Sequence, residues 1–267
     1  MKAVLSLFRI RFLNGLQYRV AALAGIATQF AWGAMEILLY KALHQSNPAA
    51  MPMELSALCS YVWMQQAFLA LFATWVIEGD LFSMVTSGNV AYELCRPMDL
   101  YANWFTRSLS TRVSRAVLRC TPILLVAVFI PQPYGLSLPR DPARLLAFLV
   151  SMVLGCLTVV SFTMLLYVSA FFTINAQGTR IIITSIADLL SGSVLPLPFF
   201  PEPIRRIVEL LPFAAMENAP LRIYSGDIAG TAALQTILLQ AFWLTVMVTG
   251  GRLLMNRALK NVVAQGG

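Results

Sequence analysis

The sequence predicts an all-α integral membrane protein with six transmembrane helices. Its 267 residues are 58% hydrophobic and only 12% charged, and the mean hydropathy is +0.73, whereas roughly 25% of the residues in a soluble domain carry a charge. Its apolar runs are suited to spans of ~20 residues, the length that a helix needs to cross the hydrocarbon core. Six such spans use most of the chain, so we expect residues 1–267 to form one transmembrane domain.

The N-terminal residues 1–19 predict a helix that lies in the plane of the membrane interface. Leu5, Phe8, Phe12 and Leu16 share one helical stripe, a spacing typical of interfacial helices. The apolar runs that follow predict spans at about residues 20–43, 55–77, 116–130, 144–172, 180–195 and 228–248. Asp99 is suited to cap a helix that continues into the third span.

A polar stretch from Glu78 to Pro97 separates the second span from that helix. It cannot lie in lipid, because backbone groups outside a helix have no partners there. We expect a short helix over residues 78–86, then extended chain over residues 89–95, where apolar and polar residues alternate. The turn formers and charges of the stretch are Glu78, Gly79, Asp80, Gly88, Glu93, Arg96 and Pro97.

A broken outer segment is predicted after the fifth span. Pro196, Pro198 and Pro201 follow one another closely, and such prolines interrupt a helix. Residues 204–211 then show the spacing of a short amphipathic helix at the membrane surface.

The distribution of lysine and arginine predicts the orientation. If the N-terminus is cytoplasmic, basic residues on the inside outnumber those outside by about two to one. Both termini and the stretch from Glu78 to Pro97 are therefore expected in the cytoplasm. The net charge of +7 lies mostly beside span ends, which favours contact with lipid headgroups over nucleic acid.

Several kinds of site are excluded or disfavoured. The three lysines do not form the glycine-rich phosphate loop of ATPases. His44 is the only histidine, and the four cysteines are scattered without a Cys-x-x-Cys pair. We therefore expect no metal site, no catalytic residues and no bound cofactor on this chain.

Two acids inside apolar runs are candidates for function, because charges within a membrane are costly. Glu36 is close enough to Lys41 for an ion pair at the outer interface, which we favour over a role in transport. Asp188 shares a small, polar helix face with Ser191 and Gly192. That face is suited either to close helix packing or to lining a polar path.

Arginines line the cytoplasmic approach to the third span. Arg112, Arg115 and Arg119 share one helix face. We favour anchoring to lipid headgroups for this face, with contact to an acidic partner as the alternative.

Two short runs carry a resemblance to a known family. They are Gly88, Ala91, Leu94, Arg96 and Pro97 after the second span, and Ser191, Gly192, Pro196, Leu197, Pro201, Leu211, Pro212 and Phe213 after the fifth. With the six-span layout, they resemble the permease subunits of type-2 ABC exporters, in the short bacterial form without a fused ATPase domain.

The resemblance implies a non-catalytic permease in the bacterial inner membrane. Two cytoplasmic ATPase subunits would bind ATP and magnesium, and a second permease, identical or homologous, would complete the substrate pathway. Glu78, Gly79, Asp80 and Gly88 would form the coupling element, with Arg96 and Pro97 fixing its return. The second and fifth spans would face the partner permease, and the resemblance implies efflux.

An ion-coupled secondary transporter is the alternative interpretation. Asp188 or Glu36 would then carry the coupling proton. Neither acid has a convincing buried basic partner in the sequence, and the long polar stretch from Glu78 would be unexplained.

Overall fold

The computed structural model describes residues 2–95, 97–139, 141–173 and 175–260, and this part of the chain is helical, without strands. The N-terminal half contains α1 (Lys2–Gly15), α2 (Arg19–Ser46), η1 (Pro48–Ala50), α3 (Leu55–Phe72), α4 (Gly79–Thr86), α5 (Val90–Leu94) and α6 (Leu100–Phe129). The C-terminal half contains α7 (Pro142–Ser169), α8 (Ala176–Leu190), η2 (Leu197–Phe199), α9 (Glu202–Glu209), α10 (Asn218–Ser225) and α11 (Gly230–Leu259).

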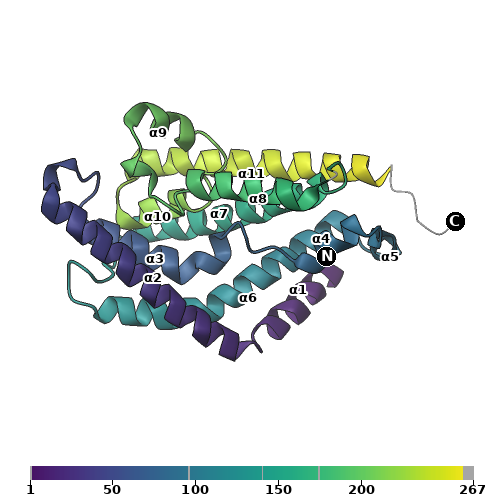
Figure 1. Ribbon diagram of the computed structural model, residues 1–267, viewed down its shortest axis with the longest axis horizontal. Coiled ribbons are helices and arrows are strands. Elements are labelled where there is room, and N and C mark those ends of the chain that lie inside the picture. The colour runs from purple at the N-terminus through teal and green to yellow at the C-terminus, as the bar shows by residue number, and fades with distance from the viewer. Residues whose placement is uncertain (1, 96, 140, 174, 261–267) are drawn as a thin grey trace.

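The long helices form a bundle whose two ends differ. α4, α5, the start of α1 and the last turns of α11 lie at one end, and α9 and the turn after α2 lie at the other (Figure 1). On the predicted orientation these are the cytoplasmic and outer ends. Four described helices are long and apolar enough to cross a membrane, namely α2, α3, α7 and α11.

Helix α3 is the centre of the bundle. It packs against α2, α6, α7 and α10, and most of its side chains, from Leu58 to Phe72, are buried. α11 packs along α7, and α1 packs against α6. Because its own chain surrounds it, α3 leaves little surface for the partner permease that the resemblance placed there.

Element boundaries differ from the sequence prediction at several places. The predicted helix cap at Asp99 is confirmed, since its Oδ1 accepts a hydrogen bond from the Ala102 N–H at 2.8 Å. The predicted second span is too long, because α3 ends at Phe72. The fifth apolar helix ends at Leu190, and the last helix continues to Leu259.

The short elements were predicted unevenly. The amphipathic helix after the prolines is confirmed as α9, whereas α10 was not predicted. The extended conformation predicted for residues 89–95 is wrong, because Val90–Leu94 is a helical turn. Val90 and Glu93 are both buried. Their spacing of three residues places them on one helix face, and this packing overrides the short alternation of apolar residues.

Candidate functional site

The polar break after α3 is organised around a buried arginine. The guanidinium of Arg112 donates to the carbonyl oxygens of Leu71 at 3.1 Å, Ala73 at 2.8 Å and Val76 at 2.8 Å. It also donates to Thr163 Oγ1 on α7 at 3.0 Å. The last carbonyls of a helix lack partners within the helix, so Arg112 satisfies this end of α3.

This contact explains why α3 stops before the end of its apolar run. Arg112 is wholly buried, and it has no carboxylate partner among the ion pairs of the described residues. Its predicted exposure to lipid headgroups is therefore wrong. Arg115, on the same helix, is exposed.

Helix α4 follows the break and is held by three different helices. The Glu78 N–H donates to the hydroxyl of Tyr167 on α7 at 2.8 Å. Asp80 forms an ion pair with Arg107 on α6, and the guanidinium of Arg180 on α8 lies 5.4 Å from the ring centre of Phe82. A displacement of α4 would thus act on α6, α7 and α8.

The glycines at the ends of α4 have different surroundings. Gly79 begins the helix, and nothing lies within 4 Å of where a Cβ would be. Gly88 has a φ of +75°, a left-handed conformation that favours glycine after a helix. Pro97 lies in the bend between α5 and α6, and Arg96 lies outside the described residues.

Asp188 on α8 lies beside the same break. Its Oδ1 accepts a hydrogen bond from Thr74 Oγ1 at 2.6 Å, and Ser191 Oγ donates to the Asp188 carbonyl at 3.1 Å. The hydroxyl of Tyr61 on α3 donates to the Gly192 carbonyl at 3.2 Å. The predicted polar face of the fifth span is thus bonded to α3 and to the residues that follow α3.

Glu36 does not form the ion pair predicted for it. Its Oε1 accepts a hydrogen bond from Gln66 Nε2 of α3 at 3.5 Å. The ammonium group of Lys41 instead lies 5.1 Å from the ring centre of Tyr134. Gln66 lies 30 residues further along the chain, and its side chain is buried at the interface of α2 and α3, so local spacing could not predict this pair.

The outer segment after α8 folds back onto the bundle. Pro196 precedes η2, Pro198 lies within it and Pro201 precedes α9. Leu197 is fully buried, and the ring of Phe199 stacks on Tyr40 of α2 with centroids 5.4 Å apart. The fifth helix ends at Leu190, before the left-handed Gly192, and the prolines that follow keep the chain out of a long helix as it returns to α2.

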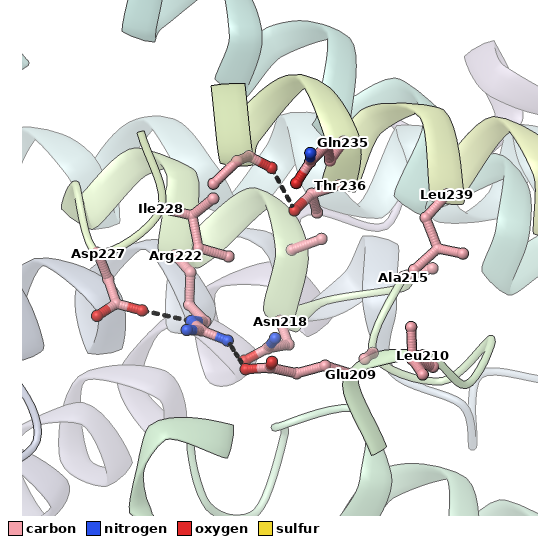
Figure 2. A pocket seen from close by; sticks show the side chains of 13 residues that line it. Glu209, Leu210, Ala215, Asn218, Arg222, Asp227, Ile228, Gln235, Thr236 and Leu239 are labelled. Atoms are coloured by element: carbon pink, nitrogen blue, oxygen red, sulfur yellow. Dashed lines mark hydrogen bonds and ion pairs between the residues drawn. The ribbon is translucent and has the colours of Figure 1, made fainter. Parts of the chain in front are cut away.

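A charged pocket lies between this segment and the last helix. Arg222 on α10 pairs with both Glu209 and Asp227, and α11 forms one wall through Thr236 and Leu239 (Figure 2). The pocket has a volume of about 570 Å³. The two ion pairs join α9, α10 and the turn between α10 and α11 into one outer unit.

Glu217, the residue before α10, was not predicted as a functional residue. It is 1% exposed, and neither carboxylate oxygen has a hydrogen-bond partner among the described residues. Burial and then the charges of Asp188 and Glu36 raise the pKa of Glu217. Its place directly after the apolar run from Phe213 to Met216 was the sequence signal that could have found it.

No group of three histidine, cysteine, aspartate or glutamate residues in the described ranges is arranged to hold a metal ion. The contacts described above are hydrogen bonds, ion pairs and helix ends. Such contacts can transmit and respond to movement between helices.

Comparison with protein families identifies the chain. The family model described as ABC-2 family transporter protein matches residues 30–266. A search of curated proteins gives no match. The family match covers α3 to α11 and most of α2, and membership implies association with ATPase components. The chain therefore belongs to the ABC-2 transporter family, as a multi-pass membrane permease subunit.

Proposed function

We propose that this chain is the permease of an ATP-driven exporter and takes up the movements of a separate ATPase through α4. The observation that carries this proposal is the attachment of α4 to three long helices, through Asp80, the Glu78 backbone and Phe82. A helix of eight residues at the predicted cytoplasmic end offers a compact docking element. Through its contacts, a displacement of α4 by the ATPase would act on α6, α7 and α8.

On this proposal α6 and α8 complete a set of six spans. α6 has 30 residues, or about 45 Å at 1.5 Å per residue, which exceeds a bilayer core of ~30 Å. Arginines in its cytoplasmic half lower its overall apolarity. α8 has 15 residues, or about 22 Å, and η2 with its flanking prolines would complete that crossing.

The second permease, identical or homologous, would pack against α2 and α8. Both helices expose large apolar side chains, including Leu38 on α2 and Ile182 on α8. Glu36 and Asp188 are half-buried on these helices. Together with Ser191 and Gly192, they would border the pathway between the two permeases.

The proposed assembly lies in the bacterial inner membrane with both termini of this chain in the cytoplasm. Two cytoplasmic ATPase subunits would hold ATP and magnesium, and this chain would hold no cofactor. Gly79 and Gly88 would delimit the docking element, and Pro97 would fix the return of the chain into α6, with Arg96 beside it.

The test is purification of the tagged chain from its native membrane in mild detergent, followed by mass spectrometry and an ATPase assay. We expect a soluble ATPase and a second permease in the eluate, with vanadate-sensitive hydrolysis. Recovery of the chain alone, together with transport that survives ATP depletion but not an uncoupler, would contradict the proposal. The ion-coupled alternative through Asp188 or Glu36 would then be favoured.

A further inference from the structure

A second polar cavity lies at the junction of α1, α2 and α6, away from the outer pocket of Figure 2. Its volume is about 590 Å³, within the ~300–1,000 Å³ typical of small-ligand sites. Arg11 comes from α1, and Arg115 and Arg119 come from α6, four residues apart. Hydroxyl and amide side chains complete the polar lining, namely Asn14, Tyr18, Thr111 and Ser114.

The three arginines of this cavity have no ion-pair partner in the part of the chain that the structure describes. None of them takes part in an ion pair or a side-chain hydrogen bond among the described residues. The charge of Arg115 also repels that of Arg119. Other arginines of this bundle differ, since Arg107 and Arg222 pair with carboxylates and Arg112 binds carbonyl oxygens. The three arginines outnumber the one acid of the lining, Glu78, so the cavity has an excess of positive charge.

The backbone brings the guanidinium of Arg119 against α2. A Cβ at Gly25 would lie 2.6 Å from the Arg119 Cζ atom, and a Cβ at Gly15 would lie 2.2 Å from Ser114 Oγ. These two glycines allow α1 and α2 to approach α6. Arg119 lies four residues further along α6 than Arg115, or about 6 Å, so the charge extends from the exposed end of the cavity inward.

Apolar residues line another side of the cavity. Ala21 and Ala22 of α2 and Leu118 of α6 lie beside the arginines. A ligand suited to this lining has an anionic head and an apolar body. The cavity adjoins α1, which the sequence places in the membrane interface, where phospholipids present both parts.

We propose that this cavity binds the phosphate headgroup of an anionic phospholipid of the cytoplasmic leaflet. Arginine is suited to phosphate because its planar guanidinium can donate two parallel hydrogen bonds. Arg11, Arg115 and Arg119 would contact the phosphate, and the acyl chains would leave along Leu118. This site does not depend on the proposed export function.

One charge in the cavity opposes the ligand. Glu78 lines the same space, and its backbone N–H donates to the Tyr167 hydroxyl at the start of α4. A headgroup in the cavity would therefore lie beside the break that leads to α4. Removal of the Glu78 charge is expected to strengthen lipid binding.

The experiment measures lipid binding to the delipidated, full-length chain by native mass spectrometry. The probes are dioleoyl-phosphatidylglycerol, dioleoyl-phosphatidylcholine and free glycerol phosphate. We expect one phosphatidylglycerol to bind in preference to phosphatidylcholine. The double variant Arg115→Gln/Arg119→Gln should weaken that binding roughly tenfold, whereas Arg257→Gln, an exposed arginine on α11 outside the cavity, should leave it unchanged.

A second variant tests the proposal through stronger lipid binding and leaves the arginines in place. Glu78→Gln should tighten phosphatidylglycerol binding about threefold, and a variant that misfolds could not produce this result. Equal binding of phosphatidylglycerol by the wild type, the double arginine variant and Glu78→Gln would overturn the proposal. Binding of free glycerol phosphate as tight as that of the lipid would overturn the lipid assignment in favour of a soluble phosphate.

Discussion

Asp80 on α4 is paired with Arg107 on α6, although the two side chains differ greatly in exposure. The aspartate side chain is 51% exposed and the arginine side chain is 3% exposed. A buried guanidinium is thus neutralised by a carboxylate that reaches it from a surface helix. Movement of α4 away from the bundle would leave Arg107 without this partner.

Charge reversal at Asp80 is expected to separate ATP hydrolysis from transport. Asp80→Arg places two positive charges together and releases α4 from α6, while the chain should still insert. The measurement compares transport per ATP hydrolysed in the purified complex. The swap Asp80→Arg/Arg107→Asp should restore part of the coupling, and normal coupling in Asp80→Arg alone would refute the role of α4.

Loss of Arg112 is expected to destabilise the fold. Arg112→Gln removes charge-assisted hydrogen bonds to the end of α3, and one such bond contributes about 1.5–3 kcal/mol. We expect unfolding in detergent to begin several degrees lower than in the wild type. Arg115→Gln is the matched control, because Arg115 is exposed on the same helix. Equal losses in both variants would contradict the capping role.

Replacement of Gly192 by alanine should destabilise the outer segment. The φ of Gly192 is +81°, and a Cβ there would lie 3.0 Å from the Tyr61 hydroxyl oxygen. The left-handed conformation alone disfavours alanine by roughly 1–2 kcal/mol. Gly250→Ala on α11 has open space around the new Cβ and should be neutral or slightly stabilising. Thermal unfolding of both variants in one detergent gives the comparison.

Glu217 should make the stability of the protein depend on pH. Its pKa is raised by burial and by nearby acids, so the folded state binds more protons than the unfolded state above about pH 4.3, the ordinary glutamate value. Stability should therefore fall as the pH rises from that value toward the raised pKa. Glu217→Gln should unfold at a higher temperature than the wild type at pH 8.5 and at a similar temperature at pH 5. A constant difference across this range would count against a buried, protonated Glu217.

The sequence contained enough information for the long helices and their order, because apolar runs near 20 residues and proline clusters are local signals. Asp99 as a cap and the amphipathic helix α9 also follow from local spacing. The end of α3 could not be predicted in this way. It depends on Arg112, which is 39 residues from Ala73 in the chain.

The same limit applies to the candidate site. Asp80 was predicted as a functional residue, but its partner Arg107 lies 27 residues away. Glu36 was assigned to Lys41 because Lys41 was the nearest opposite charge in sequence, whereas Gln66 reached it across a helix interface. Glu217 and α10 were missed because a helix of eight residues that contains a proline, Pro220, has too short a pattern to recognise.

The buried guanidinium of Arg112 has a mechanical consequence. This side chain of α6 is hydrogen-bonded to the end of α3 and to Thr163 on α7. The three helices are therefore held together at that depth. Among the hydrogen bonds of the described residues, α8 is joined to this break through the hydroxyl of Thr74, which donates to Asp188 Oδ1 and to the Thr184 carbonyl. A displacement of α4 would therefore move α3, α6 and α7 together, whereas α8, which α4 contacts separately through Phe82 and Arg180, would be free to shift relative to them.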